Sequence, residues 1–535
     1  MLFNCLTGRA TMFIKPWFDG AWLMDESRIP ILVGAGQITQ REPEPGKALK
    51  PIDLIAAAAR QAAEDAEVGQ SLLSALDTIV VLRSFSDTSW RFKSPFGGPV
   101  NPPKSLAVRL GSAQASRLVY THAGGNMPQW CINRLFEMVS RGEVGAALVA
   151  GGEALSTQKA AQRASLNLDW NEDAGGSPEE WGVSKRGWSD VEDRHRMAGA
   201  IFAYPLFENG IRGNRSRSIA EHLKQMGKLF EGFAAVASAN PLADRRDGFT
   251  AAEIATPSAK NPFIGFPYTK LMNANAFIDQ SAAVILTSVA KAKMLGIPQD
   301  RWVYLHGTAD AYDHWHISDR VNFHSSPAMR IVSEETFEMA GFGEEKLDFL
   351  DLYSCFPSAV QIACAEMGIA EDDARGLTVT GGLPYFGGPG NNYVTHSIAE
   401  MMTKVRNSSG SFGMVTANGN YVTKQSAGIY STTPTETYFK PKDPAIYQSK
   451  IDAKKGPETT EEPFGKATVE TYTVMHDRKG PSFAILFGRL EDGRRFIANT
   501  PDDPTLLADM EKMDALGLIG HVKTNSDGLA TFAPE

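Results

Sequence analysis

The chain has 535 residues, of which 43% are hydrophobic and 21% are charged, and its net charge is −9. Such a chain predicts a folded protein of two to four domains; its charge argues against nucleic-acid binding, and no apolar run approaches the ~20 residues that span a bilayer. Four scattered cysteines without metal-ligand spacing predict a reducing, cytoplasmic setting and neither disulfide nor metal site.

Residues 1–28 are expected to be an N-terminal extension. They contain basic residues but no acid before Asp19, which is a weak transit-peptide pattern. The alternative interpretation is an over-long start, with Met12 or Met24 as the true first residue. We favour the over-long start because the first clear strand, at 30–36, begins soon after Met24.

Residues 29–152 alternate strands with helices, which predicts a mixed sheet covered by helices. A glycine turn at 121–129 opens a helix whose apolar residues recur at helical spacing. The turn holds no cysteine. The expected strands are 30–36, 76–82, 117–120 and 146–152, and the expected helices are 51–66 and 128–141.

Residues 301–433 repeat this order, so the chain is expected to contain two similar α/β subdomains. Residues 153–300 do not fit the repeat and are interpreted as an inserted loop domain whose end returns to the first sheet. The expected strands of the second subdomain are 302–306, 347–352 and 413–419, its helices are 333–341, 357–368 and 393–405, and a glycine loop spans 381–392.

The last part of the chain changes character. Residues 434–463 hold five prolines and many charges, which predicts a linker or wrapping segment. Residues 464–535 show short alternating strands and a hairpin turn at 491–493. This pattern predicts a small antiparallel β-barrel domain, of the oligonucleotide/oligosaccharide-binding (OB) type. Because its surface is not clearly basic, the barrel does not imply nucleic-acid binding.

Four motifs, in order along the chain, resemble signatures of the thiolases. The segment 151–156 resembles Gly-Gly-x-Glu-x-Met-Ser, and 273–284 resembles Asn-Ala-Ser-x-x-Asn-Asp-Gly-Ala-Ala-Ala. The segment 351–356 stands where thiolases have Leu-Asn-Glu-Ala-Phe, and 381–389 resembles the Gly-Gly-x-x-x-x-Gly-His-Pro loop. With the extra barrel, the chain most resembles the thiolase-like protein type 1 group, of the sterol-carrier-type branch. The resemblance implies the α/β thiolase fold, two repeated αβαβα-type subdomains with an inserted loop domain.

The resemblance also implies a nucleophilic cysteine at a helix N-terminus, an activating histidine, a second cysteine and two oxyanion holes. The required side chains are missing. Gly125 aligns with the nucleophile, or His122 if the alignment shifts by three residues; Gly388 aligns with the histidine and Ala417 with the second cysteine. Tyr353 replaces the asparagine or histidine of the remaining motif. Ordinary thiolysis through a cysteinyl acyl-enzyme is therefore not expected.

The main-chain groups of a thiolase site are retained in this chain better than its catalytic side chains. N–H groups near Gly125 and at Gly419, which follows Asn418, are expected to form an oxyanion hole. Tyr353 resembles a tyrosine of thiolase-fold retro-aldolases that act on sterol side-chain CoA thioesters, and it would carry a proton if its pKa were lowered. The alternative is a packed tyrosine that closes the pocket. His122 is either a replacement base or a hydrogen-bonded residue at a strand end.

The expected ligand is coenzyme A or an acyl-CoA, with no tightly bound cofactor. Arg212, Arg215 and Arg217 are candidates for contacts with the CoA phosphates, although a solvated basic stretch is the commoner explanation. Gly388 is expected to line the ligand site. His314 and His316 lack a third ligand at fitting spacing, so no metal is expected.

Three functions remain open from the sequence. The first is an acyl-CoA-handling relative of the acetyl-CoA acyltransferases that works without thiolysis. The second is an aldol or retro-aldol lyase acting on a β-hydroxyacyl-CoA through Tyr353, with the fused barrel at 464–535 in the place of a separate partner. The third is a non-catalytic CoA-thioester-binding protein. Monomer and homodimer both remain open, because the barrel and the linker are candidates to cover the sheet edges through which thiolases pair.

Overall fold

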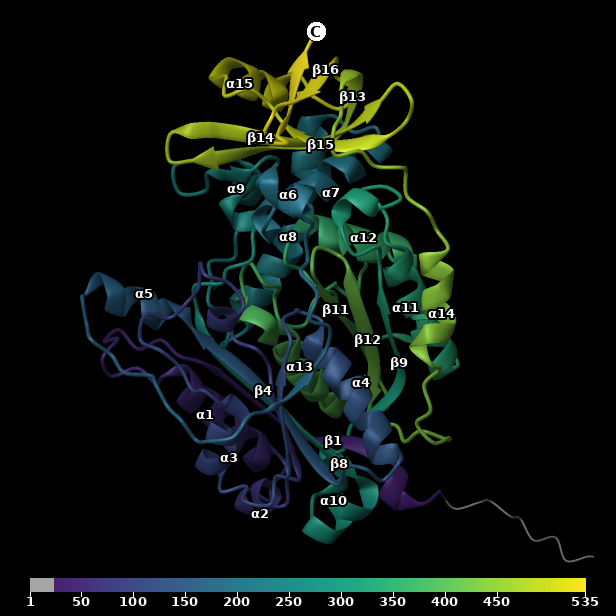
Figure 1. The fold of residues 1–535 in the computed structure, drawn as a ribbon. Helices are drawn as coiled ribbons and strands as arrows, with labels where there is room; N and C mark the ends of the chain where they lie inside the picture. The colour runs from purple at the N-terminus through teal and green to yellow at the C-terminus, as the bar shows by residue number, and fades with distance from the viewer. Residues whose placement is uncertain (1–23) are drawn as a thin grey trace, which may run out of the picture.

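The computed structural model describes residues 24–535, and most of the predicted N-terminal extension therefore lies outside the described residues. Two mixed sheets lie side by side in the body of the molecule, and a barrel formed by the end of the chain sits on top (Figure 1). This is the mixed α/β fold that the sequence predicts. No helix in the described part combines the length and the apolar character needed to cross a membrane.

The first sheet has six strands in the order β1-β8-β4-β2-β3-β5. Its central strands β4 and β8 are buried along their whole length, and both consist largely of apolar and small residues. The strand β8 ends the inserted domain and lies antiparallel between β1 and β4. The bounds are β1 Pro30–Thr39, β2 Thr78–Val81, β3 Arg117–Thr121, β4 Ala146–Ala154, β5 Glu179–Trp181 and β8 Asp279–Ser288.

The second sheet has four strands in the order β10-β11-β12-β9. Its strand β12 was not predicted from the sequence, because its buried residues include Lys424, Gln425 and Ser426 and so lack the apolar run of a core strand. The bounds are β9 Tyr304–Tyr312, β10 Phe349–Asp351, β11 Phe412–Gly419 and β12 Lys424–Ser431.

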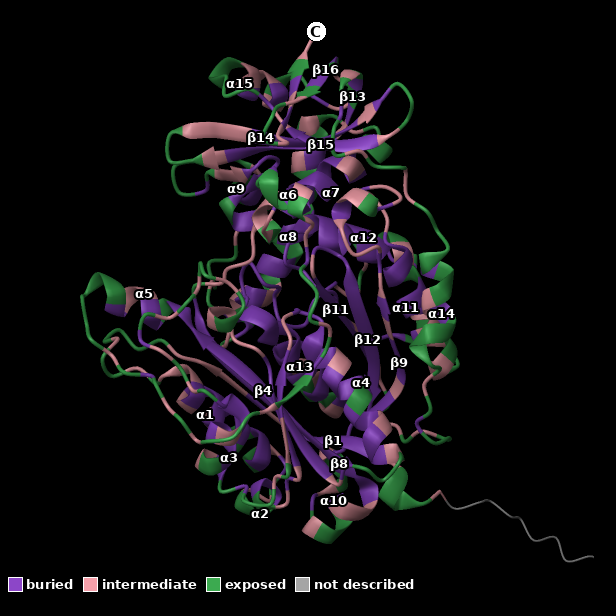
Figure 2. Ribbon diagram, in the orientation of Figure 1, coloured by how far each residue is buried: buried purple, intermediate pink, exposed green. Residues whose placement is uncertain are grey.

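Two central helices, α4 (Met127–Ser140) and α13 (Tyr393–Asn407), pack against strands of both sheets. Both helices are largely buried, as Figure 2 shows for the middle of the molecule. Other helices cover the outer faces: α1 packs on the first sheet and α11 on the second. The remaining bounds here are α1 Pro51–Asp65, α2 Gln70–Ser74, α3 Pro102–Leu110, α10 Val289–Leu295, α11 Pro327–Ala340 and α12 Pro357–Met367.

The inserted domain consists mainly of helices between the sheets and the barrel (Figure 1). Its longest helix, α8 (Ile219–Ala239), begins with a capping box in which Ser218 and Glu221 exchange hydrogen bonds with the main chain, an arrangement that fixes a helix start. The other elements are α5 Leu155–Arg163, α6 Asp190–Arg194, α7 Ala200–Asn214, α9 Ala251–Ala255, β6 Phe263–Gly265 and β7 Tyr268–Thr269.

The segment predicted as a linker, 434–463, contains a helix, α14 (Pro444–Asp452). Asp443 caps this helix, and its buried residues Tyr447 and Ile451 stand four positions apart on one face. That face packs against β9 and α11. The sequence predicted a linker or wrapping segment here but not the helix, because only two residues of the helix carry the contact.

The C-terminal barrel is closed by five strands in the order β14-β15-β17-β16-β13, because β13 pairs with both β14 and β16. A helix that the sequence did not reveal, α15 (Pro504–Lys512), joins β15 to β16. The inserted domain holds the barrel in place, since β6 pairs with β13 and α7 packs on it. The strand bounds are β13 Gly465–Asp477, β14 Gly480–Leu490, β15 Arg495–Asn499, β16 Ile519–Thr524 and β17 Ala530–Pro534.

Candidate functional site

The glycine turn 123–126 stands at the N-terminus of the central helix α4, where it meets the end of β11 from the other subdomain. The N–H of Gly124 donates to Asn391 Oδ1 at 2.9 Å. A Cβ atom on Gly419 would lie 3.2 Å from the amide nitrogen of Gly125 and 2.8 Å from Asn126 Oδ1. The main chain of the turn therefore packs directly against that of Gly419, and an oxyanion hole at these N–H groups stays a prediction.

Tyr353 lies directly against this turn. Its hydroxyl oxygen is 2.1 Å from the position that a Cβ atom on Gly125 would take. The ring is 8% exposed, and it meets the ring of Tyr393 edge-on at 5.7 Å between centroids. The phenol therefore occupies the space into which a side chain at the aligned nucleophile position would project. This contact favours Gly125 over His122 as the residue at that position.

Burial raises the pKa of Tyr353 well above its ordinary value, and the nearby Cys355 and Tyr393 add to the effect. The sequence hypothesis required a lowered pKa, and this condition is not met. A phenol with a raised pKa stays protonated at neutral pH and acts as a hydrogen-bond or proton donor. Tyr353 is therefore not a general base in this structure.

Asn418 uses its side chain to hold neighbouring structure. Its Nδ2 donates to the hydroxyl of Tyr204 at 3.0 Å, and its Oδ1 accepts from the N–H of Val422 at 3.1 Å. Tyr204 in turn stacks on Phe356, with 4.5 Å between ring centroids. These contacts fix the end of β11. Because Gly419 follows Asn418 in the chain, they also fix the position of Gly419.

The connection from β11 to β12 is strained. Asn420, Tyr421 and Val422 have φ angles of 51°, 56° and 65°, a region that non-glycine residues seldom enter and β-branched residues almost never. These three residues directly follow Gly419, and Thr423 separates them from Lys424. Strain of this kind persists only where surrounding contacts impose it.

Lys424 is the residue of this site that sequence reasoning missed. It begins β12, is 2% exposed, and donates from Nζ to the carbonyl oxygen of Ala123 at 2.8 Å. No carboxylate of the described residues lies within 4.0 Å of its ammonium group. Burial lowers its pKa to about 8. The only sequence signal was a lysine inside an otherwise uncharged segment, 421–431.

The glycine loop 381–390 approaches the turn from the second subdomain. Gly388 donates its N–H to the carbonyl oxygen of Asn275 at 2.9 Å. At Gly390, φ is +57° and a Cβ atom would lie 2.3 Å from Glu153 Oε1. The glutamate of the Gly-Gly-x-Glu motif thus supports this loop, and Gly388 offers only main chain where thiolases have a histidine side chain.

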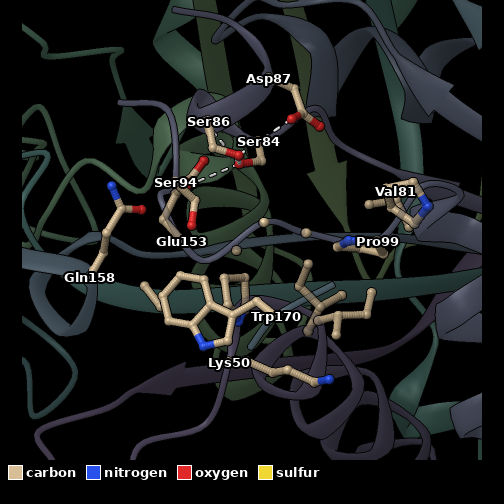
Figure 3. Close-up of a pocket in the computed structure, with 18 of the residues that line it drawn as sticks. Lys50, Val81, Ser84, Ser86, Asp87, Ser94, Pro99, Glu153, Gln158 and Trp170 are labelled. Atoms are coloured by element: carbon tan, nitrogen blue, oxygen red, sulfur yellow. Dashed lines mark hydrogen bonds between the residues drawn. The ribbon is translucent and has the colours of Figure 1, made fainter. Parts of the chain in front are cut away.

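Glu153 also lines a cavity of about 260 Å³. Figure 3 shows the side chains of Ser84, Ser86 and Glu153 above this cavity and Trp170 below it. Glu153 Oε1 accepts from the N–H of Phe85 at 2.7 Å, and burial raises the pKa of this carboxyl to about 8. The carboxyl is therefore largely protonated at neutral pH.

The three arginines do not converge on the turn. Arg212 is 1% exposed and makes a two-bond ion pair with Asp514 of the barrel domain at 2.6 Å. Arg215 pairs with Glu371 at 2.5 Å, and Arg217 is partly buried beside them. The other hydrogen bonds of Arg212 go to Asn209 Oδ1 and to the carbonyl oxygen of Arg217. The guanidinium of Arg212 is therefore occupied by protein groups, two of its bonds fixing the barrel to α7, and contact with CoA phosphates has no support here.

The three candidate histidines contact other groups. His122 follows β3, its N–H donates to the carbonyl oxygen of Trp181, and its ring lies 3.9 Å from Glu180. His314 Nε2 bonds the carbonyl oxygen of Lys454, while His316 lies 3.7 Å from Asp319. Within residues 24–535 no cluster of three potential metal ligands occurs.

Comparisons with known proteins fit this geometry. The chain matches a solved structure of a monomeric SCP2-thiolase-like protein type 1 from Mycobacterium smegmatis, with 32% identity, a TM-score of 0.82, and coverage of 96% of this chain and 100% of that one. Residues 447–528 match the family model of the thiolase-like protein type 1 additional C-terminal domain. The chain belongs to the thiolase-like protein type 1 family.

More distant thiolase-fold structures match the body of this thiolase-like protein. An acetyl-CoA acetyltransferase from Syntrophomonas wolfei has a TM-score of 0.53 at 15% identity, covering 75% of this chain and 98% of that one. An Ltp2–ChsH2(DUF35) aldolase has a TM-score of 0.54 at 15% identity, covering 76% of this chain and 98% of that one. At this identity they show the thiolase fold alone.

Proposed function

We propose that this thiolase-like protein binds a CoA thioester at the turn between Gly125 and Gly419 and acts on it without a cysteinyl acyl-enzyme. The observation that carries the proposal is the position of the Tyr353 hydroxyl against Gly125, 2.1 Å from the site of a Cβ atom. A phenol donor thus replaces the nucleophile beside main-chain N–H groups. Such a pocket supports polarisation of a thioester carbonyl, the step common to acyl-transfer and enolate chemistry.

A second candidate, a lyase acting on a β-hydroxyacyl-CoA, is favoured by the same tyrosine. In retro-aldol cleavage the C2–C3 bond breaks, the 3-hydroxyl loses its proton to a base, and the resulting thioester enolate takes a proton at C2. Because Tyr353 stays protonated at neutral pH and lies against the turn, it is placed for the second proton transfer, in which it donates to C2 and regains a proton from solvent afterwards.

Isothermal titration with CoA, acetyl-CoA and 3-hydroxybutyryl-CoA tests the proposal. We expect binding of the thioesters to the wild type, weakened at least tenfold in Tyr353→Phe if the hydroxyl contacts the acyl group. Tyr304→Phe is the matched control, because Tyr304 is 5% exposed and pairs with Ser431 at the opposite end of β12 from Lys424. Absence of binding by every thioester would overturn the proposal.

Turnover assays separate the candidates. Release of acetyl-CoA and an aldehyde from a 3-hydroxyacyl-CoA supports the lyase, and unchanged cleavage by Tyr353→Phe would overturn the role of the tyrosine. Binding without turnover of any acyl-CoA supports the non-catalytic thioester-binding function. Mass spectrometry during the reaction should show no acylated cysteine in any of these cases.

We also propose that the chain is a monomer in the cytoplasm and that its barrel is of the OB type. The relative from Mycobacterium smegmatis is described as monomeric. The edge strand β5, which pairs with β3, has only three residues, and so short an edge limits pairing with a second copy. The barrel has five strands, with a helix between its third and fourth strands. Light scattering after size-exclusion chromatography tests the monomer, and a dimer mass would contradict it.

A further inference from the structure

We infer that Lys424 is the charged hydrogen-bond donor of the glycine turn and that the site takes an acyl group whose oxygen carries or gains negative charge. The inference rests on the proposed function and deepens it, because it names a residue and a substrate class. A 3-hydroxyacyl thioester has the required groups: a carbonyl oxygen that becomes an enolate, and a hydroxyl that donates a hydrogen bond.

The first observation is where the ammonium group stands. Lys424 Nζ lies 3.5 Å from the position of a Cβ atom on Gly124 and donates to the carbonyl oxygen of Ala123 at 2.8 Å. It is therefore in contact with the turn to which Tyr353 and Gly419 also belong. A lysine ammonium has three N–H donors, and Ala123 accepts from one of them.

The second observation is that this charge has no carboxylate partner, although Nζ also lies over the ring of Trp315 at 5.5 Å from its centroid. Lys424 is 2% exposed, and among the described residues no carboxylate lies within 4.0 Å of it. An unpaired buried charge is costly unless a ligand or an ion compensates it. The strained residues 420–422, with φ of 51° to 65°, hold the lysine in this place. Two unfavourable features in one short loop indicate a functional rather than a structural role.

The third observation is that two main-chain N–H groups and one side-chain amide oxygen of the turn lack hydrogen-bond partners among the described residues. Between residues 24 and 535 we find no acceptor for the N–H of Gly125 or Asn126. These N–H groups open α4, whose dipole adds a partial positive charge at its N-terminus. Asn126 is 1% exposed, and its Oδ1 is buried without a hydrogen-bond partner, against Gly124 and Gly419.

Together these groups describe one ligand. A thioester carbonyl oxygen accepts from Lys424 Nζ and from the N–H of Gly125, and the 3-hydroxyl donates to Asn126 Oδ1. The 3-hydroxyl gives its proton to a solvent water molecule and becomes the aldehyde carbonyl as the C2–C3 bond breaks. The electron pair of that bond moves onto the thioester oxygen, where the ammonium group stabilises it. The Tyr353 hydroxyl then delivers the proton to C2. Lys424 acts as a fixed cation and forms no covalent bond.

The test uses the full-length protein with selectively ¹³C,¹⁵N-labelled lysine, the variants Lys424→Met and Lys424→Arg, and Lys291→Met as control. Lys291 also donates to a main-chain carbonyl, that of Ala75 at 3.0 Å, but it lies 3.9 Å from Asp77. The Lys424 signal is assigned by its absence from the Lys424→Arg spectrum. Binding of CoA, acetyl-CoA and 3-hydroxybutyryl-CoA is measured for each protein by titration.

We expect Lys424→Met to bind 3-hydroxybutyryl-CoA at least tenfold more weakly than the wild type, Lys424→Arg to recover most of the affinity, and Lys291→Met to match the wild type. Binding of CoA itself should be unchanged, because CoA has no acyl oxygen. Equal affinity of the wild type and Lys424→Met for both thioesters would overturn the role of Lys424 while the proposed function stands.

A ligand that lacks the CoA moiety distinguishes failure of the inference about Lys424 from failure of the proposed function. If no thioester binds the wild type, the proposed function fails, and free 3-hydroxybutyrate at millimolar concentration still tests the site. A shift of the Lys424 signal with this carboxylate, absent at Lys291, supports an anion site at the turn. An unchanged Lys424 signal with every probe overturns the inference.

Discussion

The hydroxyl of Tyr353 fills the space that the first side-chain atom of residue 125 would need, with 2.1 Å between the two positions. The glycine at position 125 and the tyrosine at position 353 therefore depend on each other, because the tyrosine hydroxyl fits only while residue 125 has no side chain. A cysteine cannot return to the start of α4 while the tyrosine remains. This contact explains how the thiolase frame persists with its nucleophile position vacated.

The first prediction concerns this pair. Gly125→Ala should lower the free energy of unfolding by about 2–3 kcal/mol, because its methyl group overlaps Tyr353 in a packed interior. In the Tyr353→Ala background the same change should cost less, with the remainder coming from the carbonyl oxygen of Asn418, which lies 2.6 Å from the Cβ position. Denaturant unfolding of the four proteins gives the coupling energy. Additive effects of the two substitutions would show that the contact does not constrain residue 125.

The second prediction concerns Lys424, whose pKa burial lowers to about 8. The unfolded chain binds more protons than the folded one between pH 8 and the ordinary lysine pKa, so stability rises with pH in this window. Below pH 8 the folded protein bears the full free-energy cost of burying the charged ammonium group, on the order of 3 kcal/mol for about 2.5 pKa units. Lys424→Met should therefore be more stable than the wild type at pH 7, by about 2 kcal/mol after loss of one hydrogen bond.

Denaturant midpoints measured from pH 7 to pH 10.5 check this prediction, with Lys291→Met as the control. The advantage of Lys424→Met should disappear as the pH approaches 10.5. An advantage that does not change with pH would mean that packing, and not the buried charge, separates the two proteins.

The third prediction concerns Glu153, whose pKa burial raises to about 8. The folded protein keeps a proton that the unfolded chain releases above about pH 4.5, so stability falls as the pH rises from 4.5 to 8. Glu153→Gln removes this dependence and should exceed the wild type at pH 8.5 by roughly 4 kcal/mol, from 1.36 kcal/mol per unit of pKa. Unfolding curves at pH 5 and 8.5 measure it, and the exposed Glu334→Gln should leave the slope unchanged.

The fourth prediction concerns the ion pair that fixes the barrel. Asp514→Asn removes the carboxylate from Arg212, which is 1% exposed, and leaves a buried charge without compensation. We expect a loss of about 3 kcal/mol in the free energy of unfolding. The double variant Arg212→Met with Asp514→Leu should lose less, because it buries no charge. If both proteins lose the same amount, the arginine contributes packing rather than charge.

The fifth prediction concerns the three described cysteines, which are all buried thiols. Burial raises the pKa of Cys355 and of Cys364 to about 12, and it raises that of Cys131 further. Since the thiolate is the reactive form, iodoacetamide should leave these three residues unmodified in the native protein at pH 8 and alkylate them after denaturation. Rapid native alkylation of Cys355, next to Tyr353, would indicate an open site.

The sequence predicted most of the sheets and central helices because their patterns are local. The helix at α4 follows from an apolar stripe with Pro128 in its first turn, and the strands β4 and β11 follow from short apolar runs. It failed at β12 and at α14, where long-range burial decides the structure. Lys424 begins a buried strand, and α14 depends on two contacts of Tyr447 and Ile451.

What the sequence alone determined is the family and the loss of the thiolase side chains, because motif order and residue identity can be read without coordinates. Gly125, Gly388 and Ala417 cannot supply a thiol or an imidazole in any fold. What only the tertiary structure decided is which residues replaced them. Tyr353, Gly419 and Lys424 come from three strand ends of the second sheet, and they meet α4 of the first subdomain only when the two sheets pack around it. The same packing directed Arg212 to Asp514 and away from the turn, because side-chain partners depend on how the subdomains pack and not on local sequence.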